Sequence, residues 1–478
     1  MSNAQQHRII QRSHILLLIA VFIACLMDGL DGSIVNVALP VLAEAFGTDT
    51  GTISWISVAY LLMVAGTVLI FGRIASLGHI KKIFIIGFTV FTVSSLFCGL
   101  APSLGVMIAA RVLQGLGASM LVACTPIICV KHLPTQILGL SFGVITAASS
   151  IGFTFGPALG GVITNFLSWH WIFWINIPIG IIAIIYALRI IPRGTPEPAE
   201  HRFDVTGAIL IFAAMVSLTY VLELLPHLGL FDPQIIIAGI FCIAAFVLFA
   251  VLSLRKEHPL FNLRIFKVRE VSAMFTAFLI IQVVIAGQLY LLPFYFTNQF
   301  GMEAFLCGLL MLVSPLVTAI LSVPFGRWSD THGRRIFCTV SCIILTAVSA
   351  VLAILHPEIG ILPFILTLIC SGVSIAMSSS PVSGQIVDHL PKADKEMGST
   401  FIMTCIYMGA VIGTAFFASI FTFMTTDKGV VASFADLSQD VFASGFTGAM
   451  FAAAGLSAAA VVLCALVKDK KRKPGPGS

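Results

Sequence analysis

Charged residues are scarce in this sequence: only 10% of its 478 residues are Asp, Glu, Lys or Arg, whereas 58% are apolar. A soluble domain carries roughly 25% charged residues. The chain therefore has too little polar surface to coat a water-soluble globule, which excludes a soluble enzyme. The net charge of +5 arises from basic residues spread along the chain, so no nucleic-acid partner is expected. The composition indicates an integral membrane protein surrounded by a lipid bilayer.

The motifs of metal, disulfide and nucleotide chemistry are also missing. The 11 cysteines lie almost entirely in apolar runs without a CxxC pair, and we expect them to pack as small apolar side chains. No GxxxxGK[ST] loop is present, so ATP is not expected as the energy source. No nucleophile–base pair or metal-ligand cluster lies within an apolar run. We therefore expect no enzyme activity, no cofactor and no metal.

Long apolar runs, in contrast, are abundant. A helix that crosses a bilayer needs about 20 mostly apolar residues. This length predicts an all-α membrane protein with about fourteen transmembrane helices. The predicted spans are 15–44, 52–77, 82–101, 104–130, 137–166, 171–191, 205–225, 233–254, 270–298, 304–328, 335–355, 359–387, 398–425 and 444–467.

The basic residues predict the orientation, because Lys and Arg favour the cytoplasmic side of a membrane. With the N-terminus inside and alternating spans, all but two of the 26 Lys and Arg residues fall in cytoplasmic segments. Of the two, Lys428 falls outside and Arg111 lies within a span. We expect a multi-pass protein of the cytoplasmic (inner) cell membrane with both termini in the cytoplasm, since the polar N-terminus has no cleavage site for a signal peptide.

An internal repeat divides the chain. GRIASLGHIKKIF at 72–84 and GRWSDTHGRRIF at 326–337 each close one span and lead into the next. Two six-helix bundles separated by an inserted helix pair is the simplest interpretation, and a substrate site is then expected between the halves near the middle of the membrane. The predicted domains are an N-terminal tail 1–14, an N-terminal bundle 15–191, an inserted pair with linkers 192–268, a C-terminal bundle 269–467 and a basic tail 468–478.

Ionisable residues inside the predicted spans need a reason, because each costs about 2.5–3.5 kcal/mol or more. Asp28 and Asp31 are three apart in the first span, on one helix face, and Arg111 lies in the fourth. Burial favours the neutral form of a carboxyl group, so Asp31 is a candidate proton carrier whose affinity for protons depends on its distance from Arg111. The alternative is a static ion pair that holds two helices together. Asp28 either lines a cavity or reaches its rim.

The fifth span contains GFTFGPALGG at 152–161. Small residues allow helices in a bilayer to approach closely, and proline kinks a helix. The stretch is expected to seal one side of the cavity, or else to be a general packing face. Its candidate residues are Gly152, Gly156, Pro157, Gly160 and Gly161.

Aromatic and neutral polar residues of the spans are candidates for contact with a small lipophilic substrate, because aromatic faces attract cations. Ordinary packing is the alternative for each of them. With Asp28, the candidates are Trp55, Tyr60, Gln114, Gln282, Tyr290, Phe294 and Tyr407.

Four stretches together resemble the 14-spanner drug:proton antiporter family of the major facilitator superfamily. They are LDGSIVNVALP at 30–40, RVLQGLGAS at 111–119, GFTFGPALGG at 152–161 and WHWIFWINIPIG at 169–180. The resemblance implies the major facilitator fold, with Asp31 as the protonation site and Arg111 in proton transfer. It also implies that the glycine-rich motif is that of an exporter.

The resemblance has departures. The superfamily's loop after the second helix usually reads GxLaDrxGrr, but Ser76 and Leu77 occupy its acidic and basic positions. In the family this loop latches the two halves, so the latch is expected to be weaker here and to depend more on the second copy. Gly32 and His170 also replace common family residues. The gating residues are Gly72, Arg73, Gly326, Asp330, Gly333, Arg334 and Arg335.

The function expected from the sequence is proton-coupled export of lipophilic, cationic drugs, that is, multidrug efflux and antibiotic resistance. Protons would enter as the substrate leaves, and the transporter is expected to be a monomer. Export of an endogenous metabolite, such as an amino acid or a siderophore, is the alternative, and competition by dyes would separate the two.

Overall fold

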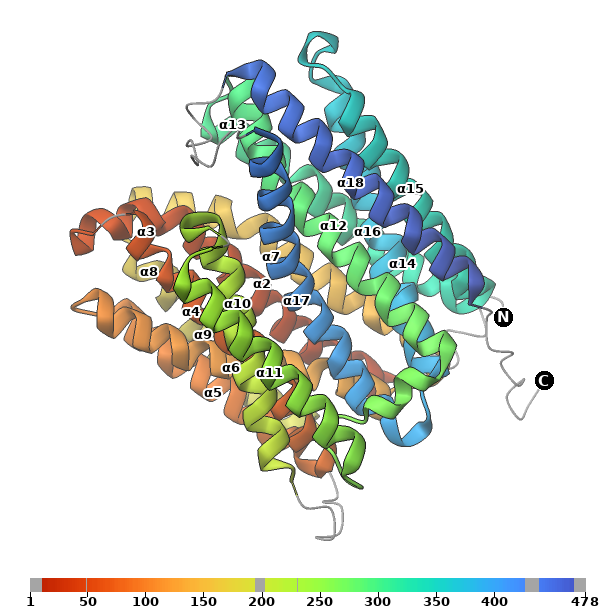
Figure 1. Ribbon diagram of the computed structural model, residues 1–478. Coiled ribbons are helices and arrows are strands. Elements are labelled where there is room, and N and C mark those ends of the chain that lie inside the picture. The colour runs from red at the N-terminus through yellow and green to blue at the C-terminus, as the bar shows by residue number, and fades with distance from the viewer. Residues whose placement is uncertain (1–10, 49, 194–202, 230, 426–437, 468–478) are drawn as a thin grey trace.

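The computed structural model describes residues 11–48, 50–193, 203–229, 231–425 and 438–467 (Figure 1). Most of the two predicted tails and part of the predicted linker before residue 205 thus lie outside the described residues. The described chain is helical and contains no strand, which confirms the predicted all-α membrane fold.

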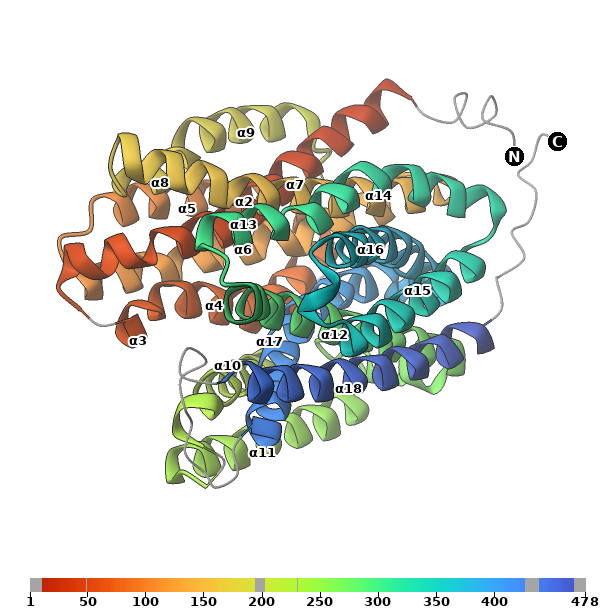
Figure 2. The ribbon, with the colours of Figure 1, turned by 90° about the horizontal axis from the view of Figure 1, so that it is seen from above.

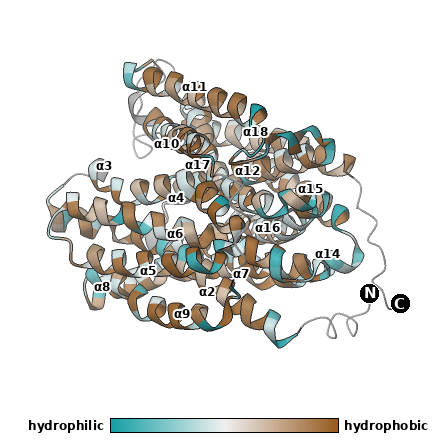
Figure 3. Ribbon diagram, turned by 90° about the horizontal axis from the view of Figure 1, so that it is seen from below, coloured by the Kyte–Doolittle hydropathy of each residue, from teal (hydrophilic) through white to brown (hydrophobic). Residues whose placement is uncertain are grey.

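The helices are long and apolar, with brown hydrophobic residues along most of their length in Figure 3. Within the described residues, 13 helical segments are long and apolar enough to cross a membrane. One of them, Trp55–Gly99, has 45 residues and contains two crossings. Its halves meet at η1 (Ala75–His79), where Gly78 has φ 96°. Counted separately, these two crossings give the predicted number of spans.

The helices of the predicted N-terminal bundle and inserted pair come first in the chain. Their helices are α2 (Arg12–Phe46), α3 (Thr50–Ile53), α4 (Trp55–Ile74), α5 (Ile80–Gly99), α6 (Leu104–His132), α7 (Leu138–Phe166), α8 (His170–Trp174), α9 (Asn176–Ile190), α10 (Val205–Leu228) and α11 (Pro233–Arg255). The 3-10 turn η2 (Thr135–Ile137) precedes α7.

The C-terminal bundle follows a linker that contains η3 (Leu263–Lys267). Its helices are α12 (Arg269–Phe300), α13 (Ala304–Met311), α14 (Val313–His332), α15 (Arg334–Ile354), α16 (Leu362–His389), α17 (Lys395–Thr425) and α18 (Gln439–Leu466). The short turns η4 (Pro357–Ile359) and η5 (Lys392–Asp394) precede α16 and α17.

Two bundles lie side by side, with α7 and α17 at their junction (Figures 1 and 2). In the N-terminal bundle α2 packs against α7, and in the C-terminal bundle α12 packs against α17. Across the junction α7 packs on α14 and α16, while α17 packs on α4 and α6. The inserted α10 packs on both α4 and α17, and α11 covers α10.

The helices alternate in direction, so the bundle has two faces. We call the face at which α2 begins and α18 ends the terminal face, and the other the opposite face (Figure 1). Apart from Arg111, the described Lys and Arg residues lie at helix ends or in loops of the terminal face, whereas acidic residues such as Glu44, Asp232 and Asp440 lie toward the opposite face. This is the charge asymmetry on which the predicted orientation rests.

Candidate functional site

Asp31 of α2 and Arg111 of α6 form an ion pair inside the N-terminal bundle. The Arg111 Nη1 and Asp31 Oδ2 atoms are 2.6 Å apart. The Arg111 side chain is 1% exposed and the Asp31 side chain is 0% exposed. Arg111 also donates from Nε to the carbonyl of Ile56, 3.0 Å away, and its guanidinium lies 4.3 Å from the centre of the Tyr60 ring. The predicted proximity of the two charges is therefore present, with an aromatic face against the cation.

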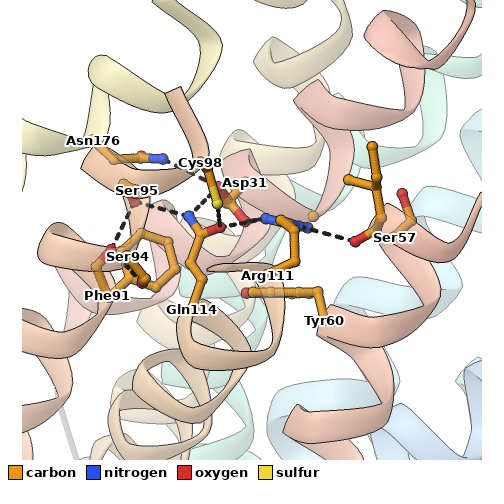
Figure 4. Close-up of polar contacts among 12 residues, drawn as sticks. Asp31, Ser57, Tyr60, Phe91, Ser94, Ser95, Cys98, Arg111, Gln114 and Asn176 are labelled. Atoms are coloured by element: carbon orange, nitrogen blue, oxygen red, sulfur yellow. Dashed lines mark hydrogen bonds and ion pairs between the residues drawn. The ribbon is translucent and has the colours of Figure 1, made fainter. Parts of the chain in front are cut away.

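Two amide side chains complete the site (Figure 4). Gln114 donates from Nε2 to Asp31 Oδ1 at 2.9 Å and to the hydroxyl of Ser95 at 2.8 Å. Asn176, the first residue of α9, donates to Asp31 Oδ1 at 3.1 Å. Gln114 Oε1 in turn accepts from Arg111 Nη1 at 2.6 Å. Side chains of α6 and α9 thus satisfy the buried carboxylate of α2, and Ser95 of α5 holds Gln114 in place.

The pair lies nearer the opposite face than the terminal face. Arg111 stands seven residues from the opposite-face end of α6, or about 10 Å at the helical rise of about 1.5 Å per residue. Asn176 and Ile56 belong to the first turns of helices that begin at the same face. Between the pair and this side of the molecule lies a buried apolar cluster that includes Leu42, Met107 and Phe173.

Asp28 has a different environment although it shares a helix with Asp31. Its Oδ1 accepts from the Tyr60 hydroxyl at 2.9 Å, and its Oδ2 accepts from the Tyr407 hydroxyl of α17 at 2.8 Å. Asp28 is only partly buried, and the bond to Tyr407 crosses from one bundle to the other. The structure thus places Asp28 at the junction, where a substrate passing between the halves would meet it.

The glycine-rich motif of α7 packs on α2. A Cβ atom added at Gly152 would lie 2.6 Å from the Leu30 nitrogen, and one at Gly160 would lie 2.9 Å from the Ile34 carbonyl. One added at Gly156 would overlap the Ser33 hydroxyl. Gly161, by contrast, has open space around its Cβ position, and Pro157 lies inside the helix without ending it. Three glycines four residues apart therefore let the two backbones touch.

The other substrate candidates are scattered. Gln114 belongs to the Asp31 network rather than to the junction. Trp55 lies 6.4 Å from the Tyr220 ring of α10, measured between ring centres. Tyr290 and Phe294 of α12 contact each other edge to face at 5.5 Å. Gln282 of α12 has a buried Oε1 atom without a hydrogen-bond partner in the described part of the chain.

The second copy of the repeated loop joins the two bundles at the terminal face. Asp330 accepts the backbone N–H groups of Gly139 and Leu140, both at 3.0 Å, at the start of α7. Its carboxylate also pairs with Arg334 at 2.7 Å, and Arg334 pairs with Asp388 at 2.8 Å. A carboxylate at a helix N-terminus is stabilised by the helix dipole, so this contact holds α14 to α7.

Two glycines of the second loop copy permit the close helix contact and the turn that follows it. Gly326 packs directly on the Gly139 backbone, and Gly333 has φ 91°, which favours glycine at the turn into α15. Arg335 donates to the Ala465 carbonyl near the end of α18.

The first copy makes a different contact. A Cβ atom at Gly72 of α4 would overlap the Thr400 side chain of α17. Ser76, at the acidic position, donates to the Arg73 carbonyl of its own helix at 2.9 Å. Nearby, Lys131 of α6 pairs with Glu396 at 3.2 Å. With Asp330, these contacts close the terminal face between the bundles.

Sequence reasoning missed Asn176 and Ser95 as partners of Asp31. Asn176 lies in the stretch WHWIFWINIPIG, where an amide within an apolar run is itself a signal of a buried polar partner. Ser95 carried no such signal, because serine is common in membrane helices and bonds to its own backbone.

Comparisons with known proteins agree on one family. The family model described as "Major Facilitator Superfamily" matches residues 21–414 and 273–478. The chain is 31% identical to the riboflavin transporter RibZ of Clostridioides difficile over 85% of this chain and 88% of that protein. It is 27% identical to a multidrug resistance protein B homolog of Mycobacterium tuberculosis over 86% of this chain and 77% of that protein. The crystal structure of the human organic anion transporter MFSD10 (TETRAN) has a TM-score of 0.61 at 15% identity, covering 95% of this chain and 100% of that one, and shares its fold.

Proposed function

Because the chain belongs to the Major Facilitator Superfamily, we propose that it is a proton-coupled antiporter that exports lipophilic cations by alternating access. Its apolar helices and its family make it a multi-pass membrane transporter of small molecules. The observation that carries the proposal is the buried Asp31–Arg111 pair, held by amide donors beneath one face of the bundle. We propose no enzymatic step, and a monomer as the working unit.

The orientation follows from the basic residues. They gather on the terminal face, which we assign to the cytoplasm because Lys and Arg favour that side. The closed side of the structure is then cytoplasmic, and the Asp31 site lies under the outer face. This arrangement suits an exporter, in which protons load from outside while the substrate is released there.

We assign the coupling of proton entry to substrate export to a change in the distance between Asp31 and Arg111. In the structure, Arg111 and the Asp31 carboxylate form an ion pair at 2.6 Å. Protonation of Asp31 removes that attraction and leaves Arg111 with Gln114 and the Ile56 carbonyl as partners. The helices α2 and α6 are then free to shift against each other, and substrate binding at Asp28, one turn away on α2, acts on the same helix.

The substrate class is assigned from the junction. Asp28 supplies a carboxylate, and the Tyr60 and Tyr407 hydroxyls that donate to it bring two aromatic side chains to the same place. A lipophilic cation is the ligand that this chemistry favours. The similarity to the riboflavin transporter RibZ over most of the chain supports the alternative, a metabolite with a flat ring system.

Proteoliposomes with an imposed pH gradient and a trapped pH-sensitive dye test the proposal. Tetraphenylphosphonium, ethidium and riboflavin are added separately to the wild type and to Asp28→Asn. Proton flux triggered by the cations, and weakened by Asp28→Asn, supports cation export. Flux triggered by riboflavin alone, and unchanged in Asp28→Asn, replaces it with metabolite transport.

A further inference from the structure

The first repeated loop has no acidic residue that corresponds to Asp330 of the second loop. One side of the terminal face therefore lacks the carboxylate contact that the other side has. Ser76 stands four residues after Gly72, as Asp330 stands four residues after Gly326. Gly72 packs on α17 as Gly326 packs on α7. A carboxylate joins α14 to α7, whereas Ser76, at the corresponding position of the first copy, has a hydroxyl that donates to the nearby Arg73 carbonyl.

A segment of the inserted region lies on this weaker side. Residues 256–268, which we call the strap, connect α11 to α12 and run along the start of α17. Phe261 is 2% exposed and stacks on Phe401 of α17, with ring centres 4.7 Å apart and an angle of 24° between the rings. Phe266 and Phe275 contact the same Phe401 ring at 5.7 and 5.1 Å.

A polar contact fixes the strap beside these rings. The Asn262 amide donates to both carboxylate oxygens of Asp394, at 3.2 and 3.3 Å, in the turn that precedes α17. The side-chain oxygen Oδ1 of Asn262 accepts the backbone N–H of Arg264 at 3.2 Å, which sets the direction of the Asn262 side chain. Asn262 thereby holds the N-terminal end of α17 from outside the C-terminal bundle.

The strap is also tied to the other bundle. The Leu260 N–H donates at 3.1 Å to Asp204, which caps α10 by accepting the Gly207 N–H at 2.9 Å and pairs with Lys256. From Asp204, α10 runs along α4, where the Phe212 ring would lie 3.0 Å from a Cβ atom at Gly66. A continuous path of packed groups thus leads from α17 through the strap and α10 to α4.

We propose that the strap and α10 form a clamp that holds α4 and α17 together at the terminal face, in place of the carboxylate that Ser76 lacks. The inserted helix pair then has a role in gating: it favours the state closed at this face. The clamp depends on the proposed function in one respect: the two bundles must move apart at the terminal face during transport. Its test needs no substrate and no proton gradient, so its failure is separate from a failure of proton coupling.

Spin labels at Lys82 and Lys392, exposed at the terminal face on different bundles, report the distance between them. Cys370 is replaced first because it is the exposed cysteine, whereas the other cysteines are buried. Asn262→Asp places a like charge against Asp394 and is expected to raise the ratio of open to closed molecules about fivefold, whereas Asn262→Lys is expected to lower it by a similar factor.

Phe261→Ala removes the stacked ring and is expected to raise the same ratio about tenfold. Phe231→Ala, at an 87% exposed residue of the inserted region, is the matched control and is expected to leave the distances unchanged. Opposite shifts in the two Asn262 variants support the clamp, since a residue needed only for folding lowers stability in both. Unchanged distances in Asn262→Asp, Asn262→Lys and Phe261→Ala overturn it.

Discussion

Replacement of Asp330 by Asn is expected to open the terminal face. The variant keeps the size of the side chain but removes its charge from the start of α7. The Asp330 side chain is 0% exposed and accepts two backbone N–H groups from the other bundle at 3.0 Å. An Asn side chain accepts one of these groups through its oxygen and presents its own N–H groups to the other.

The size of the expected change follows from the contacts of Asp330 that join the two bundles. Loss of the negative charge at a partly buried helix N-terminus costs up to about 2 kcal/mol. One unsatisfied buried N–H costs about 1–3 kcal/mol. The closed state is thus expected to lose about 3 kcal/mol relative to the open state, which changes the ratio of the two states roughly 100-fold.

The bond between Asp330 and Arg334 lies within the C-terminal bundle, so its loss affects both states alike. Asp388→Asn is therefore the matched control. It removes the other partner of Arg334, at 2.8 Å, without touching α7. We expect it to lower thermal stability and leave the equilibrium between the states unchanged.

Distances between spin labels at Lys82 and Lys392 measure the outcome. The expected result is a long-distance population that dominates in Asp330→Asn and stays small in Asp388→Asn. If both variants open the terminal face equally, or neither does, the contact of Asp330 with α7 is not what holds the bundles together.

Further predictions concern packing, a buried amide and pH. Gly152→Ala is expected to abolish transport or folding, because its Cβ would lie 2.6 Å from the Leu30 nitrogen of α2, whereas Gly161→Ala, with open space there, retains transport in the same vesicle assay. Gln282→Leu removes a buried oxygen without a partner in the described chain, so the melting temperature is expected to stay or rise. Burial by itself raises the pKa of Asp204, but hydrogen bonds from Lys256 and two backbone N–H groups bring it below its ordinary value. Its contribution is thus present above about pH 4, the ordinary range of Asp, and is lost as pH falls through the lower pKa of the folded state. The difference in melting temperature between wild type and Asp204→Asn is expected to shrink on acidification below about pH 4, and a constant difference contradicts this.

Much of the fold was predictable because hydrophobic length is a strong signal in membrane proteins. The break between α4 and α5 is an example: the apolar run is interrupted only by the polar loop at Gly78, yet the chain reverses there. The glycine spacing in α7 likewise predicts a packing face. Which glycines face α2 depends on the helical rotation, and Gly161 lies one position away from the stripe.

The site was predictable in part. A lone arginine in an apolar span requires a carboxylate, so the proximity of Arg111 and Asp31 follows from the cost of burying a charge. The separation of Asp28 from Asp31 does not follow. Residues three apart on a helix differ by about 60° in direction, and here that rotation points Asp31 toward α6 and Asp28 toward Tyr407. The strap's contacts with α17 and the turn before it were not predictable, because they join segments more than 130 residues apart.

The central claim is that Asp31 couples proton entry to export, and Asp31→Asn tests it most directly. In this variant Arg111 keeps Gln114 and the Ile56 carbonyl as partners, so the fold is expected to persist. The measurement compares two activities in proteoliposomes: exchange of labelled for unlabelled tetraphenylphosphonium without a gradient, and its accumulation driven by a pH gradient. We predict that Asp31→Asn retains exchange and loses gradient-driven accumulation together with substrate-triggered proton flux. Gradient-driven accumulation at the wild-type level in Asp31→Asn would contradict the account and move the coupling to another residue.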